Sequence, residues 1–99
     1  MVDKEIVQIK TRELYHLLLV KDVDVTLAYR ILRKIYKVAW YKQQVQLAKT
    51  PESESLARWS LDIARGGLEN TLRKLNICDL DKDLVRFIAN NYTIEENGK

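Results

Sequence analysis

This sequence has few residues that break or cross-link a chain. Three glycines and one proline among 99 residues leave long uninterrupted stretches, which favour helices over many short strands. The single cysteine, Cys78, excludes an internal disulfide, and with the single histidine, His16, it offers too few soft ligands for a structural zinc site. No hydrophobic run approaches the ~20 residues that span a bilayer, and the N-terminus lacks a signal-peptide core. We therefore expect a cytoplasmic protein that does not bind membranes.

Length and composition predict one folded domain. Ninety-nine residues suffice for one hydrophobic core but not for two. Hydrophobic residues at 46% and charged residues at 31% lie in the range of globular proteins. We expect a single helical domain over residues 1–99. Residues 1–10 either begin the first helix or form an extended segment, and residues 93–99 are expected to fray.

One long segment of the chain contains no acidic residue. Six of the 17 Lys and Arg and none of the 14 Asp and Glu lie between residues 25 and 51, so this segment carries +6 and the rest of the chain −3. The net charge of +3 hides this asymmetry. Such a segment suits binding to phosphate backbones or to an acidic protein surface, although a merely solvated basic face gives the same pattern.

The same segment predicts a long central helix over about residues 25–49. Its apolar residues recur at steps of three and four, and therefore form one stripe that faces a core: Ala28, Ile31, Leu32, Ile35, Val38 and Ala39. Its cations gather on another face, roughly 120° away. With a nearby aromatic residue they are the predicted binding residues for nucleic acid or an acidic partner: Arg30, Arg33, Lys34, Lys37 and Tyr41. The other aromatic residues near this face, which could support stacking, are Tyr29, Tyr36 and Trp40.

Capping signals predict the other helices. Thr11 is a candidate N-cap for a first helix that ends near Val20, and Asp24 is one for the long helix. Thr50-Pro51 predicts the start of a third helix, and Asp79 that of a fourth. The predicted fold is therefore all-α, a small bundle of three or four helices around the long helix, which is expected to overhang its neighbours.

The third predicted helix is more apolar than one packing surface requires. Its second apolar stripe, Leu56, Trp59 and Ile63, either contacts another helix of the bundle or forms a subunit interface. With Trp40, these residues are the candidates for a homodimer interface. Gly66-Gly67 either closes a tight packing contact, kinks the helix or ends it. Charges of opposite sign alternate along the helix and predict a series of ion pairs among Glu54, Arg58, Asp62, Arg65, Glu69 and Arg73.

No arrangement of residues typical of catalysis is present. The sequence contains no G-x-S-x-G, H-E-x-x-H or C-x-x-C motif. We therefore predict a non-enzyme without cofactor, metal or small-molecule substrate. The leading hypothesis is a small regulatory or interaction protein that binds nucleic acid. The alternative is a protein–protein adaptor, inhibitor or immunity-type bundle that binds an acidic protein surface.

The first two predicted helices also have the outline of a helix-turn-helix. A short connection joins them, and the second is rich in Arg and Tyr. However, no glycine marks the turn, and the second helix is much longer than the three turns that a recognition helix needs. The pattern therefore leaves this DNA-binding motif as a further alternative.

Overall fold

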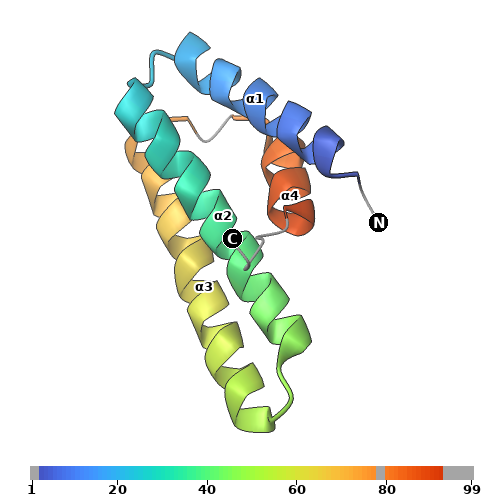
Figure 1. Ribbon diagram of the computed structural model, residues 1–99. Helices are drawn as coiled ribbons and strands as arrows, with labels where there is room; N and C mark the ends of the chain where they lie inside the picture. The colour runs from blue at the N-terminus through green and yellow to red at the C-terminus, as the bar shows by residue number, and fades with distance from the viewer. Residues whose placement is uncertain (1–2, 78–79, 93–99) are drawn as a thin grey trace.

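The computed structural model describes residues 3–77 and 80–92, which contain four α-helices (Figure 1). In chain order they are α1 (Lys4–Val20), α2 (Val25–Leu47), α3 (Pro51–Lys74) and α4 (Lys82–Asn91). The predicted all-α bundle is therefore confirmed. No helix in these two ranges is both long and apolar enough to cross a bilayer.

Helix α2 lies at the centre of the bundle. It contacts α1, α3 and α4, while α1 also contacts α4. Within the described ranges, α3 contacts no helix other than α2. Figure 1 shows α2 and α3 side by side as an antiparallel α2–α3 hairpin, with α1 and α4 nearer the end where α2 begins. The end of α4 reaches as far along α2 as Lys42 and Gln43. The far end of the hairpin extends beyond them, which agrees with the predicted overhang and the elongated extents of 44 × 29 × 24 Å.

The hydrophobic core lies where α1 and α4 cover α2. The predicted apolar stripe of α2 is buried along its whole length, from Ala28 to Ala39. The largest fully buried side chains come from three helices: Leu14 and Leu18 from α1, Ile31 and Ile35 from α2, and Ile88 from α4. Because α2 uses this one stripe for packing, its opposite side remains in solvent.

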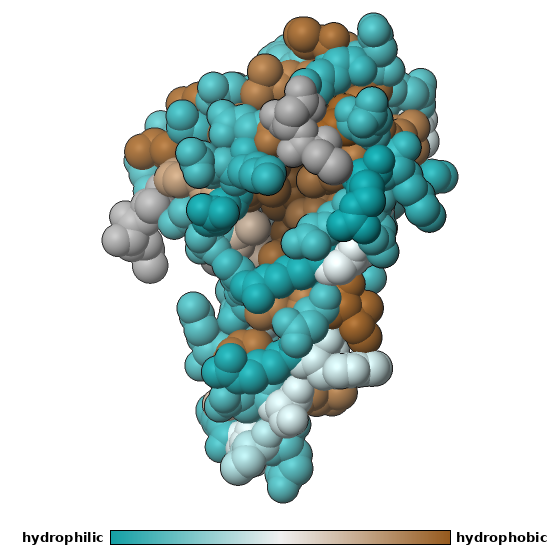
Figure 2. All heavy atoms as spheres, turned by 180° about the vertical axis from the view of Figure 1, so that it is seen from behind, coloured by the Kyte–Doolittle hydropathy of each residue, from teal (hydrophilic) through white to brown (hydrophobic). Residues whose placement is uncertain are grey.

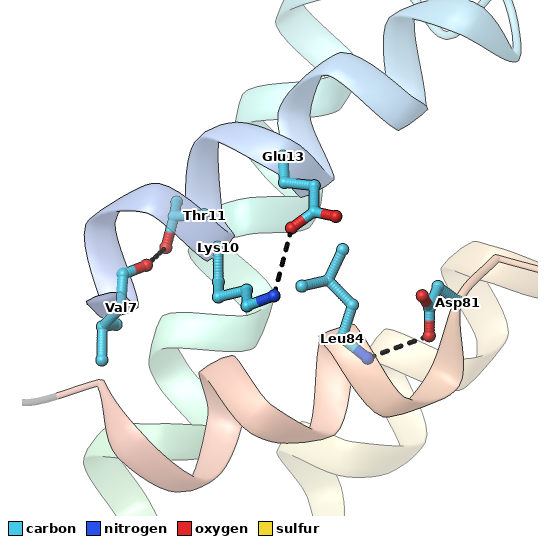
Figure 3. Close-up of polar contacts among 6 residues, drawn as sticks. All are labelled: Val7, Lys10, Thr11, Glu13, Asp81 and Leu84. Carbon is cyan, nitrogen blue, oxygen red and sulfur yellow. Dashed lines mark hydrogen bonds and ion pairs between the residues drawn. The ribbon is translucent and has the colours of Figure 1, made fainter. Parts of the chain in front are cut away.

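The first helix begins much earlier than the sequence predicted. Asp3 is its N-cap, with a side chain that accepts a hydrogen bond from the Glu5 amide at 3.0 Å. The predicted cap at Thr11 is wrong, since the Thr11 hydroxyl donates to the Val7 carbonyl at 2.8 Å from within the helix (Figure 3). The extra turns of α1 bury Val7 against the bundle, and this packing stabilises them. Residues from Lys4 onward are thus helical, which resolves the ambiguity of that part of the N-terminal segment.

The predicted starts of α2 and α3 are confirmed by their capping bonds. The Asp24 carboxylate accepts from the Thr26 amide at 3.0 Å. Thr50 accepts from the Ser53 amide at 3.1 Å, and Ser53 accepts in return from the Thr50 amide at 3.4 Å. Pro51 occupies the first helical turn, where its missing N–H would have no helical partner.

The cap of α4 is Asp81, so the predicted assignment of this role to Asp79 is wrong. Asp81 accepts a hydrogen bond from the Leu84 amide at 3.0 Å (Figure 3), while Asp79 itself lies outside the described residues. Leu84 and Ile88, which lie one helical turn apart in α4, are both buried against the core. Burial of these two residues therefore favours a helix that starts after Asp81.

Two turns use left-handed backbone conformations without glycine. Asp22, between α1 and α2, has φ 63°, and Asn76, after α3, has φ 57°. Asp and Asn tolerate this region better than other non-glycine residues because their short side chains bond locally. The α1–α2 turn is therefore tight although it contains no glycine.

Replacing Ile35 by Ala should lower the free energy of unfolding by about 2–5 kcal/mol, because it leaves a cavity in the core. Val20→Ala is the matched control: it also removes a β-branched helical residue, but the Val20 side chain is 79% exposed. Its effect should stay within about 0.5 kcal/mol. Urea unfolding followed by circular dichroism measures both, and equal effects of the two changes would contradict the observed core.

Candidate binding surface on the α2–α3 hairpin

The predicted cations of α2 lie on its solvent side. Arg30, Arg33 and Lys37 are exposed, and Lys34 is partly buried beside α3. We call these four residues the cationic face. They are placed there by the helical repeat, because the opposite side of α2 is occupied by the buried stripe.

The cationic face has no acidic partner in the described part of the chain. The ion pairs in the structure join neighbours on other helices, such as Lys10 with Glu13 in α1 at 3.5 Å (Figure 3) and Arg58 with Glu54 in α3 at 2.9 Å. None of the four cations lies within ion-pair distance of a carboxylate in residues 3–77 and 80–92. Their spacing of three and four residues instead places like charges next to one another, which is mildly destabilising. These four cations therefore form no ion pair that would stabilise the described fold.

Helix α3 places an exposed apolar stripe beside these cations. Leu56, Trp59 and Ile63 are 62%, 62% and 56% exposed. Because α3 contacts only α2 among the described helices, this stripe does not pack against another helix there. Of the two interpretations that the sequence allowed, contact with a second helix of the bundle is therefore wrong. In the described part of the chain, the stripe is therefore an exposed surface.

A hollow of about 350 Å³ lies between α2 and α3 and is lined by residues of both helices. Its lining consists of Lys34, Lys37 and Tyr41 from α2 and Trp59, Ser60, Ile63, Ala64 and Gly67 from α3. The structure thus brings together part of the predicted binding set and part of the predicted interface set. Arg30 and Arg33 lie outside this lining, nearer the start of α2. Trp40 and Leu56 line an adjoining hollow of about 440 Å³, which they share with Tyr41 and Leu47.

The glycine pair lies on the same side of α3. The helix continues through Gly66 and Gly67 without ending, so that predicted possibility is wrong. A Cβ at Gly66 would meet no atom within 4 Å, and one at Gly67 would meet only the Lys34 Nζ, at an ordinary contact distance of 3.9 Å. Intramolecular packing therefore does not account for the pair. The two glycines leave a strip of helical backbone without side chains at the edge of the hollow.

The aromatic residues of α2 divide into two groups. Tyr29 packs on Tyr15 of α1 with 5.4 Å between ring centroids, and Tyr36 stacks on Tyr92 at 4.1 Å. Burial raises the pKa of Tyr36, and the nearby Tyr92 adds to the effect. These two rings therefore hold the bundle together rather than extend the cationic face. Tyr41 lies at the hollow, where Trp59 of α3 supplies a second and more exposed ring.

The sequence did not show that α3 contributes to this surface. Ser60, Ala64 and Gly67 line the hollow but carry no chemical signature of their own. The signal that could have found them is the short connection between α2 and α3, which makes the two helices antiparallel neighbours. Antiparallel pairing places the start of α3 beside the end of α2, and hence Trp59 beside Tyr41.

Replacing Lys37 by Glu should raise the free energy of unfolding by about 0.2–0.5 kcal/mol in dilute salt, because a carboxylate would relieve repulsion with Arg33 and Lys34. The gain should vanish near about 1 M salt, where the Debye length is ~3 Å. Arg58→Glu is the control with the opposite sign, since it breaks an existing pair with Glu54. Urea unfolding at both salt concentrations measures these effects. A loss of stability for Lys37→Glu would show that the fold uses this cation.

The described residues do not form a metal-binding cluster. Within residues 3–77 and 80–92, no group of three or more His, Cys, Asp or Glu side chains lies close enough together to hold a metal ion. His16 is exposed on α1 and packs edge-on against the neighbouring Tyr15 at 6.0 Å. The chain as a whole matches no protein-family model, no curated protein sequence and no solved structure.

Proposed function

We propose that this chain is a small non-catalytic interaction protein that binds nucleic acid with the cationic face and the adjoining hollow. The supporting observation is a set of four neighbouring cations without a described acidic partner, next to an exposed indole. Arg and Lys bind phosphate oxygens, and exposed aromatic rings stack on bases. We propose a regulatory role for this binding.

The dimensions of the cationic face suit a nucleic-acid backbone. Arg30 and Lys37 are seven residues apart, which corresponds to about 10 Å at the helical rise of ~1.5 Å per residue. Each strand of duplex DNA presents a phosphate about every 3.4 Å along the helix axis, so this length covers roughly three phosphates of such a strand. Four cations along it can neutralise these phosphates and release their counterions.

The exposed ring of Trp59 favours a single strand over a duplex. Base faces are hidden by stacking within a duplex but are free in a single strand. Trp59 is 62% exposed and lines the same hollow as Lys37 and Tyr41. A base stacked on this indole would keep its own phosphate within reach of the cations of α2. The bare backbone at Gly66 and Gly67 leaves room for the strand to pass along α3.

An acidic protein surface is the alternative partner. The observation that favours it is the apolar character of the stripe around Trp59, since Leu56 and Ile63 are also more than half exposed. Protein interfaces often combine such an aromatic anchor with cations at the rim. Under this alternative, the same cations would contact carboxylates and the stripe would be covered by the partner.

We also propose that the chain forms a homodimer through the overhanging end of the α2–α3 hairpin. Leu47 and Leu56 are 65% and 62% exposed there, and they line one hollow together with Trp40. The only charged residue lining that hollow is Lys49, so like charges oppose self-association less here than at the cationic face. A symmetric dimer of this kind would leave Arg30, Arg33 and Lys34 in solvent.

Labelled single-stranded oligonucleotide should bind the wild-type chain in a fluorescence anisotropy titration, with an affinity that falls steeply with salt. Neutralising three phosphates predicts a log–log slope of about −2 for a single strand. The double change Arg33→Glu/Lys37→Glu should abolish binding. Trp59→Ala should weaken binding of the single strand by about 1–3 kcal/mol, because it removes the stacking surface.

Lys10→Glu/Arg12→Glu is the matched control for the oligonucleotide titration. It makes the same change in net charge on α1, at residues that do not belong to the cationic face, and should weaken binding much less. Circular dichroism verifies that all variants remain helical. Absence of binding to any single strand or duplex, even in dilute salt, would reject the nucleic-acid proposal in favour of an acidic protein partner. Equal losses in the two double variants would reject the cationic face as the site.

Sedimentation of the wild-type chain at tens of micromolar should give twice the mass of one chain. Leu56→Glu should give the monomer mass, because it places a charge in the apolar contact. Glu52→Gln, which changes an exposed residue one helical turn away, is the control and should leave the dimer intact. A monomer for the wild-type chain at this concentration would show that the dimer proposal is wrong.

A further inference from the structure

A second groove lies on the other side of α3 from the hollow, between α3 and α4. Figure 2, which shows the molecule from behind, reveals hydrophobic side chains in a hollow between hydrophilic ones on this face. The groove has a volume of about 570 Å³, and Val38 of α2 lies at its base. It exists because α3 and α4 both pack against α2 but make no contact with each other. The gap between them forms a groove that is lined by residues of the core.

The floor of this groove is apolar and continuous with the core. Val38, Leu68, Leu80 and Ala89 are buried, and two further residues, Leu72 and Val85, are partly buried against the same cluster. An apolar group placed in the groove would therefore extend the existing core rather than start a separate contact. Such burial is worth about 25 cal/mol for each Å² removed from water.

The rim of the groove is cationic. Arg65 and Arg73 come from α3, Lys82 and Arg86 from α4, and Glu69 is the acidic residue among the lining. The ion pairs that the sequence predicted for Arg65 and Arg73 do not form with any described carboxylate. Arg73 instead donates to the Asn70 side chain at 3.3 Å, and Arg86 lies 3.9 Å from the almost fully exposed Asp83.

Lys42 of α2 adds to this concentration of positive charge. Its ammonium group donates to the Asn90 side chain, and its pKa is lowered, first by burial and then by the nearby Arg65 and Arg86. Cations from three helices thus repel one another beside an apolar groove. An anionic group placed there would relieve this repulsion.

We infer that the groove between α3 and α4 docks an acidic amphipathic helix of a partner protein. Apolar side chains at steps of three and four would lie on the floor at Leu68, Leu72 and Val85. Flanking carboxylates would then reach Arg65 and Arg73 on one side and Lys82 and Arg86 on the other. Residues 65–73 of α3 extend about 12 Å, which corresponds to roughly two turns of the docked helix.

Other occupants match this groove less well. Nucleic acid supplies phosphates but no apolar side chains for the floor. A second copy of this chain would bring its exposed stripe of Leu56, Trp59 and Ile63, which lies beside Lys34 and Lys37, and like charges would meet at the rim. An acidic helix supplies both the apolar groups and the charge. The groove shares no residue with the hollow of the α2–α3 hairpin, so this inference does not rest on nucleic-acid binding.

The probe for a test is a fluorescent 14-residue peptide with leucines at steps of three and four and glutamates elsewhere. Anisotropy should show binding to the full chain, and a scrambled peptide of the same composition should bind at least tenfold more weakly. Arg65→Glu/Arg86→Glu should weaken binding of the first peptide at least tenfold. Arg30→Glu/Arg33→Glu makes the same charge change on the cationic face and should alter the affinity less than twofold.

Amide chemical-shift mapping on the unmodified chain gives a readout that needs no variant. The amphipathic peptide should shift the amides of Leu68, Leu72, Val85 and Ala89. Equal binding of the scrambled peptide, or shifts confined to α2 residues 30–37, would overturn the inference. Binding to vesicles of anionic phospholipid but not to the peptide would also overturn it, in favour of a lipid surface. Loss of oligonucleotide binding in Arg33→Glu/Lys37→Glu bears only on the proposed function, because those residues do not line this groove.

Discussion

The packing of one stripe of α2 determines which surfaces of this molecule are free. Ile31 and Ile35 are fully buried within that stripe, and α1, α3 and α4 all contact α2. A single helix that organises three neighbours must present a wide apolar face, and its remaining surface is then left for solvent. In this chain the remaining surface carries Arg30, Arg33, Lys34 and Lys37. The core thus fixes both the position and the orientation of the cations.

In the described residues, buried polar groups have hydrogen-bond partners, whereas several exposed cations have no acidic partner. Helix starts are capped by Asp3, Asp24, Thr50 and Asp81, and no buried side-chain polar atom in the described residues lacks a hydrogen-bond partner. Within residues 3–77 and 80–92, the cationic face and the cations around the groove between α3 and α4 have no acidic partner or only a loose one. Exposed ion pairs contribute little to stability, so their absence costs the fold little. Unbalanced charge therefore remains where a partner of opposite sign can approach.

The features that depend on local sequence were predictable. The stripe from Ala28 to Ala39, the caps at Asp24 and Thr50 and the all-α class follow from helical periodicity and from side chains within a few residues of each helix start. The wrong predictions concern features set by tertiary contacts. Thr11 looks like a cap but lies inside α1, because the burial of Val7 extends the helix past it. Likewise, the burial of Leu84 and Ile88 selects Asp81 as the cap of α4.

Only the part of the candidate site that lies on one helix was predicted, because the rest depends on tertiary contacts. The members of the cationic face are neighbours on one helix, so periodicity alone groups them. Trp59 and Ile63 belong to another helix, and their place beside Lys37 depends on how α3 lies against α2. The apolar stripe of Leu56, Trp59 and Ile63 is exposed because no further described helix lies on that side. Sequence periodicity contains no information on either point.

Among the described helices, α3 packs against α2 alone, and this determines where the molecule unfolds locally. At the overhanging end of the hairpin, the first turns of α3 are held by α2 alone, whereas its last turns lie where α1 and α4 reinforce α2. Local unfolding requires least free energy where the fewest apolar contacts are lost. The backbone amides of α3 should therefore show graded protection from hydrogen exchange, weakest near Pro51 and strongest near Leu68. The end of the hairpin that bears Trp59 is then the part of the bundle that can adjust its shape without disturbing the core.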